Sequence, residues 1–171
     1  MSAPRSVGTD SLDPWVVDPG VLDPGVESRV RASFARQTMP RTLGVTMAEV
    51  GPGRVVLEMP RDPRFGQQFG YTHAGAVTTL VDTACGYAAL TRMAPDREVL
   101  TVDFTANFLA PAAGERFRAT ATVLRAGRTI VVTRGEVHAL DGAGTARLVA
   151  AMQATMMAVP PPPATPEDRA A

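Results

Sequence analysis

A single carboxylate, Asp82, stands within a strongly apolar stretch of the sequence. An ionised Asp beside an apolar surface is costly unless it is paired or used, and a carboxylate can act as a general base or as a nucleophile. His73 lies nine residues earlier, where a histidine could transfer protons, cap a helix or pack. Two such residues at this spacing do not define a site by themselves. Whether Asp82 and His73 lie close together depends on the helices and strands that carry them.

Residue usage excludes several other chemistries. All seventeen basic residues are Arg, so no lysine is present for a Schiff base, a phosphate loop or a general base. Every Ser lies at or before Ser33 and there is no G-x-S-x-G turn, so a serine nucleophile would lie outside the patterned core. Two His and the single Cys85 have unrelated spacings, which do not make a zinc site.

An apolar helix is predicted from Gly75 to Met93, just before Pro95. On a helical projection Asp82 lies about 20° from Ala89, at the edge of the apolar stripe. A carboxylate is therefore expected where the helix meets another surface, beside small residues that leave space. The stripe consists of Val77, Leu80, Val81, Ala84, Cys85, Ala88 and Ala89, so Cys85 is predicted to be a small buried side chain.

Two apolar runs precede this helix and predict a hairpin. They are Leu43–Val50 and Arg54–Pro60, separated by the turn residues Gly51-Pro52-Gly53. A further amphipathic helix is predicted upstream of them, from Val26 to Met39. The hairpin is expected to form one part of an antiparallel sheet.

Four strand-like segments follow the long helix, at Val99–Ala110, 117–123, Thr129–Ala139 and 146–156. In the first segment the even positions from Leu100 are apolar and are predicted to face inward. Consecutive strands with short turns predict a meander. One long apolar helix must then cover one face of the sheet, which gives a two-layer α+β domain.

The charge balance and the composition of the chain limit the classes of partner and the location that are expected. Seventeen basic and seventeen acidic residues cancel, so neither nucleic acid nor a membrane is an expected partner. No apolar stretch approaches the roughly 20 residues that cross a bilayer, and a cytoplasmic location is expected. Residues 1–25 are predicted to form an irregular arm, 26–158 the folded domain, and 159–171 a disordered Pro-rich tail.

One segment resembles a known family signature. Gln67 to Leu90 reads QQFGYTHAGAVTTLVDTACGYAAL, which resembles the phenylacetate-degradation (PaaI-like) branch of the hotdog acyl-CoA thioesterases, in the 4-hydroxybenzoyl-CoA thioesterase superfamily. That signature has Asn or Gln, five residues, His-Gly/Ala-Gly, six residues, then Asp. The positions that match are Gln67, His73, Ala74, Gly75 and Asp82. The stretch TVDFTANFLAPAAGE, Thr101 to Glu115, also resembles the family, and the likeness covers about residues 43–157.

The resemblance implies a hotdog fold, an antiparallel sheet wrapped around one long central helix, in a homodimer or a homotetramer built as a dimer of dimers. It implies that the Ala74 amide, in the His73-Ala74-Gly75 turn, donates to the oxyanion of an acyl-CoA thioester. Asp82 would act as base or nucleophile beside the partner subunit's turn. Gln67 would hold the lytic water or the carbonyl, Thr101 would help to position water, and His73 would shape the turn.

The substrate would be an acyl-CoA, and neither a metal nor an organic cofactor is expected. Arg125 and Arg128 flank Gly127 at a turn and could meet the CoA phosphates, although solvated charges are the simpler interpretation. Three alternatives stay open: an acyl-CoA-binding hotdog protein without activity, an enoyl-CoA hydratase or dehydratase, and a dimerising scaffold. The hydratases have a His about five residues after the Asp, where this chain has Tyr87.

Overall fold

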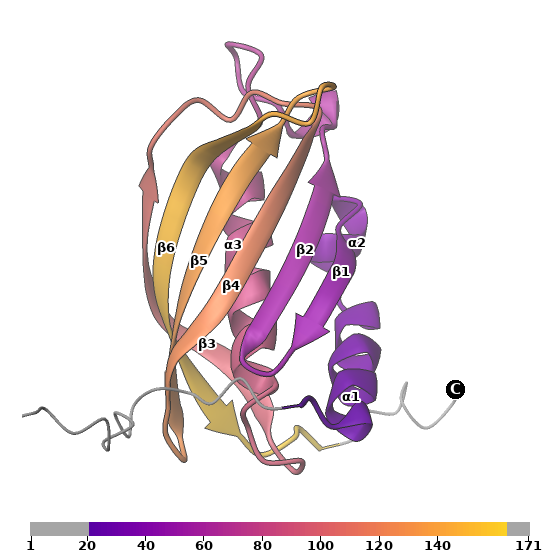
Figure 1. Ribbon diagram of the computed structural model, residues 1–171, viewed down its shortest axis with the longest axis vertical. Coiled ribbons are helices and arrows are strands. Elements are labelled where there is room, and N and C mark those ends of the chain that lie inside the picture. The colour runs from indigo at the N-terminus through magenta and orange to yellow at the C-terminus, as the bar shows by residue number, and fades with distance from the viewer. Residues whose placement is uncertain (1–20, 164–171) are drawn as a thin grey trace, which may run out of the picture.

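The computed structural model describes residues 21–163 (Figure 1). The predicted arm therefore falls mostly outside the described residues, as does the end of the predicted tail. The elements in chain order are α1 (Pro24–Ala35), α2 (Thr38–Thr42), β1 (Thr46–Gly51), β2 (Arg54–Pro60), a 3-10 turn (Pro63–Phe65), α3 (Ala74–Leu90), β3 (Glu98–Phe108), β4 (Arg116–Ala126), β5 (Ile130–Leu140) and β6 (Ala146–Val159).

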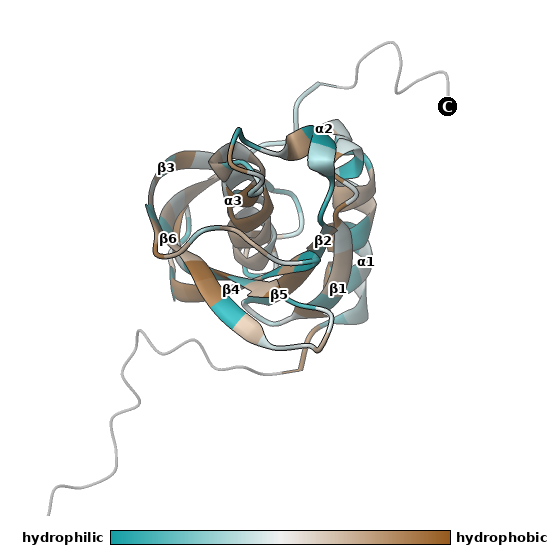
Figure 2. Ribbon diagram, turned by 90° about the horizontal axis from the view of Figure 1, so that it is seen from above, coloured by the Kyte–Doolittle hydropathy of each residue, from teal (hydrophilic) through white to brown (hydrophobic). Residues whose placement is uncertain are grey.

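All six strands form one antiparallel sheet in the order β1-β2-β4-β5-β6-β3. Seen from above, the curved sheet surrounds α3 (Figure 2). The predicted α+β hotdog arrangement, the β1–β2 hairpin and the long buried helix are thus confirmed. No helix in the described part of the chain is long and apolar enough to span a membrane.

The predicted order of the meander is partly wrong. Strands β4, β5 and β6 are consecutive neighbours, but β3 pairs with β6 at the sheet edge and not with β4. Residues 109–115 join β3 to β4 and include Pro111. Because this connection is longer than the usual hairpin loop, β3 can leave its sequence neighbour and extend the far side of the sheet.

The predicted single helix from Val26 to Met39 is also wrong. It is two helices, α1 and α2, with a break at Arg36 and Gln37. Pro40 explains the break, since its ring would collide with the carbonyl of the residue four positions earlier and has no N–H to donate. Helix α1 begins at Pro24, inside the predicted arm, because Asp23 accepts a hydrogen bond from the Gly25 N–H at 2.7 Å.

Helix α3 packs against the sheet at very close range. A Cβ added to Gly135 of β5 would lie 2.5 Å from Val81 Cγ2 and 2.9 Å from Cys85 Sγ. The glycine therefore allows the helix and the sheet to touch. Cys85 is buried and its burial raises the pKa of the thiol to about 12, so the prediction of a buried structural side chain is confirmed.

The carboxyl end of α3 is held by Arg29 of α1. Its guanidinium donates to the carbonyl oxygens of Leu90 at 2.8 Å, Met93 at 3.1 Å and Ala94 at 2.7 Å. The last carbonyls of a helix have no partners within the helix and carry partial negative charge. Arg29 adds a charged donor at Leu90, the last residue of α3, and at Met93 and Ala94 just beyond it, and so fixes α1 to the end of α3.

Strand β3 does not follow the predicted alternation. A bulge between Thr101 and Asp103 shifts the register, so that Thr101 pairs with the buried Met156 and Phe104 with the buried Ala154. Thr101 therefore faces α3, and not the same side as Asp103. The predicted inward face is confirmed for Phe104, Ala106 and Phe108, which pair with buried residues of β6, but before the bulge Thr101 and not Leu100 is on that face. Much of the apolar surface of this edge strand is nevertheless exposed. The exposed side chains are Leu100, Val102, Phe104 and Phe108.

Candidate active site

Among the described residues, the first turn of α3 presents one free backbone donor. His73 is the N-cap, and its Nδ1 accepts a hydrogen bond from the Gly75 N–H at 2.9 Å. The His73 N–H itself donates to the Phe65 carbonyl at 2.8 Å, which anchors the turn. Within the described residues the Ala74 N–H has no hydrogen-bond partner, and Ala74 is exposed. An exposed N–H at a helix N-terminus is suited to bind an anion.

The loop before this turn carries Gln67. Its N–H donates to the Tyr71 carbonyl at 2.8 Å, and its side-chain Oε1 accepts from the Phe69 N–H. The carbonyl end of the amide is thus used within the loop. Gln67, His73 and Ala74 line one pocket of about 320 Å³, together with exposed Phe69 and Tyr71. The structure brings these three predicted site residues together.

Asp82 lies in the middle of α3 and is only partly exposed. The Thr101 hydroxyl donates to its Oδ1 at 2.9 Å. Burial raises the pKa of the Asp82 carboxyl, and the Thr101 hydrogen bond acts in the opposite direction with a smaller effect. A half-buried carboxylate with a raised pKa is a stronger base than an exposed one. The two residues border a separate pocket of about 100 Å³.

The two groups of candidate residues do not meet within one chain. Asp82 follows Ala74 by eight residues of a continuous helix, a rise of about 12 Å. Arg125 and Arg128 lie at the β4–β5 turn, where the Gly127 N–H donates to the Ile130 carbonyl at 2.8 Å. That turn is at the end of the sheet opposite the loop that carries His73 (Figure 1). The candidate residues of one chain therefore form separate groups.

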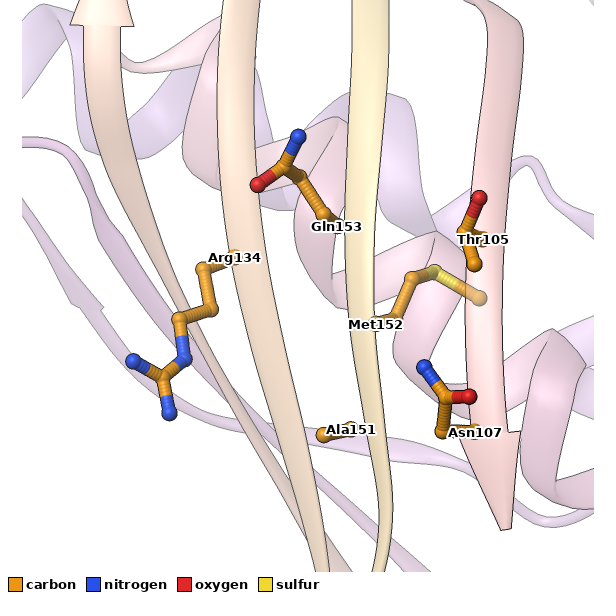
Figure 3. A pocket seen from close by; sticks show the side chains of 6 residues that line it. All are labelled: Thr105, Asn107, Arg134, Ala151, Met152 and Gln153. Atoms are coloured by element: carbon orange, nitrogen blue, oxygen red, sulfur yellow. The ribbon is translucent and has the colours of Figure 1, made fainter.

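Another pocket, of about 440 Å³, lies on the outer face of the sheet (Figure 3). Its polar side chains are Arg134 on β5, Gln153 on β6, and Thr105 and Asn107 on β3. The backbone there belongs to the strands of the sheet, so this pocket has no helix N-terminus comparable to that at Ala74.

Comparisons with known proteins identify the family of this chain. A sequence model described as "Thioesterase superfamily" matches residues 69–146, which include the Ala74 turn and Asp82. Human acyl-coenzyme A thioesterase 13 is 31% identical over 125 residues, covering 71% of this chain and 85% of that protein. The chain belongs to the thioesterase superfamily. Its predicted class, thioester hydrolase, is thereby confirmed.

Solved structures similar to this chain have the same fold. A thioesterase family protein from Silicibacter pomeroyi is 46% identical with a TM-score of 0.77, and the match covers 80% of this chain and 99% of that one. The PaaI protein of Escherichia coli has a TM-score of 0.71 over 81% of this chain and 96% of its own, at 22% identity. At that identity the likeness extends to the fold alone.

Sequence analysis assigned no site role to five residues that border the Asp82 pocket: Gln37, Thr83, Gly86, Tyr87 and Val99. A signal for Gly86 was present, since a glycine in the middle of a helix is costly and this one is four residues after Asp82, on the same helix face. Gln37 carried no signal, because it was placed inside a continuous helix. Its position near Asp82 depends on the break between α1 and α2.

Proposed function

We propose that this thioesterase is a homodimer that hydrolyses acyl-CoA, with the Ala74 amide of one subunit and Asp82 of the other acting on one thioester. The observation that carries the proposal is the separation of the two half-sites along α3. An oxyanion donor and a carboxylate about 12 Å apart cannot both reach one carbonyl group. A second copy can supply the missing half.

Strand β3 is the surface that favours such a dimer. It is an edge strand of 11 residues whose outer edge has unpaired backbone groups, and it exposes Leu100, Val102, Phe104 and Phe108. Long apolar edges of this kind readily pair with another strand. In such a dimer β3 pairs with its copy in the antiparallel direction around a two-fold axis. The end of each subunit that carries the His73 turn then lies beside the end of the partner that carries the β4–β5 turn. The proposal thereby brings the partner's Asp82, and its Arg125–Arg128 turn, toward the first subunit's Ala74. A further pairing of dimers would give the tetramer expected from the sequence.

In the proposed reaction the thioester carbonyl oxygen accepts the Ala74 N–H, and the helix dipole stabilises the developing negative charge. Asp82 acts either as a base that takes a proton from the attacking water, or as a nucleophile that forms an anhydride which water then cleaves. In both routes the carbon–sulfur bond breaks, CoA leaves as a thiolate that takes up a proton, and the acid is released. The reaction requires neither a metal nor an organic cofactor.

The remaining candidates have supporting roles in the proposal. Thr101 orients the Asp82 carboxylate through the 2.9 Å hydrogen bond. The Gln67 amide NH₂ makes no hydrogen bond within the described residues, lies beside the Ala74 turn and would hold water or the carbonyl. Arg125 and Arg128 would bind CoA phosphates. The proposal includes a cytoplasmic location, where acyl-CoA substrates and a reduced Cys85 are expected.

Thiol release from a panel of acyl-CoA substrates tests the activity. Turnover of at least one substrate is expected, whereas tight binding of acyl-CoA without turnover would identify a binding protein instead. Sedimentation analysis of the same sample gives the oligomeric state. A monomer that turns over acyl-CoA at full rate would contradict the shared site.

A mixing experiment tests whether the site is shared. Asp82→Asn and Ala74→Pro should each be inactive alone. After the two are unfolded and refolded together, a shared site predicts recovery of about a quarter of the wild-type activity, because half of the dimers are mixed and each has one intact site. If both half-sites acted within one subunit, the mixture would stay inactive.

A further inference from the structure

We infer that Gly86 makes room for the acyl group and that the pocket beside it selects a short aliphatic acyl chain, an inference that rests on the proposed function. The starting observation is a glycine in the middle of α3. Glycine in a helix interior costs about 1 kcal/mol relative to alanine. Such a cost calls for a reason. Gly135, which faces α3 from β5, and Gly86, which lies within α3, have different ones.

Gly135 is explained by packing, because a Cβ there would strike Val81 and Cys85. Gly86 is not, since a Cβ added to it would have no atom within 4 Å. The space in front of Gly86 is therefore not filled by any described residue of its own subunit. Solvent, a bound molecule or a second subunit can occupy it, and its place beside Asp82 favours a bound molecule.

The empty space lies beside the carboxylate. Gly86 is four residues after Asp82, which places both on the same helix face one turn apart. Together they border the pocket of about 100 Å³. Its other lining residues are Gln37, Thr83, Tyr87, Val99 and Thr101, of which Tyr87 is the one furthest along α3 from the Ala74 turn. A group bound next to Gly86 would touch the carboxylate that acts on the thioester.

The far end of this pocket is closed by a fixed wall. The Tyr87 side chain is buried and its ring meets the Phe34 ring edge-on at a centroid distance of 5.6 Å. The Tyr87 hydroxyl also lies 3.4 Å from the Ser33 hydroxyl, within hydrogen-bond distance. CoA is large and highly charged and must extend into solvent. The closed side of Asp82 is therefore left for the acyl group.

The volume limits what fits there. A cavity of roughly 150 Å³ is known to accept benzene. The pocket beside Gly86 has about 100 Å³ within one subunit. A short aliphatic acyl chain fits this space and an aryl ring does not.

Two substitutions at Gly86 test the inference. Gly86→Ala should fold and should raise Tm by about 2–4 °C, since alanine favours the helix and its Cβ meets nothing. Gly86→Leu should fill most of the pocket. The measurement is kcat/KM for acetyl-, butanoyl-, hexanoyl- and benzoyl-CoA. Wild type should prefer the first two. Each substitution should lower the butanoyl-to-acetyl ratio of kcat/KM by at least about tenfold.

A matched control is Gly51→Ala in β1. A Cβ there would have only ordinary contacts, 3.9 Å or more from Arg54, so this change adds one methyl group away from the pocket. It should leave the acyl preference unchanged. Equal loss on all four substrates in the Gly86 variants, an unchanged preference, or dissociation of the dimer on size-exclusion chromatography would overturn the inference. The last result would mean that the partner subunit fills the space.

Failure of the proposed function gives a different result. If wild type hydrolyses none of the four substrates, the proposed activity is wrong, and acyl selection is then judged by calorimetry with the same four compounds. Tighter binding of the two shortest acyl groups, weakened by Gly86→Leu, would support selection by the Gly86 pocket. Equal affinities in wild type and variant would overturn it.

Discussion

The two ends of α3 differ in how the backbone groups that have no partner within the helix are satisfied. At the carboxyl end, Arg29 donates to the carbonyls of Leu90, Met93 and Ala94, and the first two of these residues are buried. At the amino end His73 satisfies one N–H, while the Ala74 N–H stays exposed. Helix ends with free backbone groups lower stability unless something binds them. The carboxyl end of α3 therefore contributes to stability, whereas the amino end is available to a substrate.

The substitution Ala74→Pro is the strongest test of this difference between the two ends of α3. Proline has no N–H, and it is well tolerated at the first position of a helix. The preceding His73 has ψ 140°, which is compatible with a following proline. Loss of the oxyanion donor should lower kcat by about 10²–10³, with Tm within about 2 °C of wild type. Thiol release and thermal unfolding measure the two effects.

Ala74→Gly is the matched control, because it changes the same residue and keeps the N–H. It should retain most of the activity. A Pro variant with normal kcat would show that the free amide at this end does not take part in the reaction.

The opposite result is expected at the other end of the helix. Arg29→Ala leaves three carbonyls without their charged donor and should lower the free energy of unfolding by about 2–3 kcal/mol. Below the unfolding transition kcat should be unchanged. Denaturant unfolding measures the loss, and Arg36→Ala, which removes an exposed guanidinium 3.8 Å from Glu98, should change stability by less than about 0.5 kcal/mol. Equal losses in the two variants would mean that Arg29 does not hold the helix end.

The sequence predicts the groups at the amino end of α3 but not those at the carboxyl end. His73, Ala74 and Asp82 lie on one short segment, where helical periodicity fixes their relative positions. Arg29 and Leu90 are 61 residues apart and belong to different helices. Such a contact depends on how α1 packs, and local patterns do not carry that information.

Strand β3 illustrates a second limit. Its alternation of apolar and polar residues correctly predicts a strand, and the family resemblance selects Thr101 as a site residue. The bulge that turns Thr101 toward Asp82 has no signature in the local sequence, because a register shift depends on the partner strand β6. The exposed apolar side chains of β3 also violate the simple pattern. They are explained only if a surface outside the single chain covers them, as in the proposed dimer.

Substitutions of His73 should have a smaller effect on stability and would define the role of this residue. His73→Ala removes the Nδ1 acceptor for the Gly75 N–H and should lower stability by about 1 kcal/mol. His73→Asn offers another good N-cap acceptor and should restore most of it. If His73 only shapes the turn, Asn should also keep kcat within about fivefold of wild type. A loss of 10²–10⁴ in the Asn variant would instead identify His73 as an acid or base.

The smallest predicted change concerns pH. Burial raises the pKa of Asp82, so kcat/KM should fall on the acid side at a higher pH than it would for an exposed Asp. Thr101→Val removes the hydroxyl that donates to the carboxylate, so the pKa rises further and the acid limb moves to higher pH. Thr105→Val, on the outer face of the same strand, should leave the limb in place.

Stability should follow the same titration. Because the pKa of Asp82 is higher in the folded state than in the unfolded state, its contribution is most favourable below the ordinary Asp pKa and is lost as pH rises through the raised value. Thr101→Val widens that window. Its Tm deficit relative to wild type should therefore be larger at neutral pH than at pH values below the ordinary Asp pKa. A constant deficit, together with an unshifted acid limb, would mean that Asp82 is not the group that titrates in the reaction.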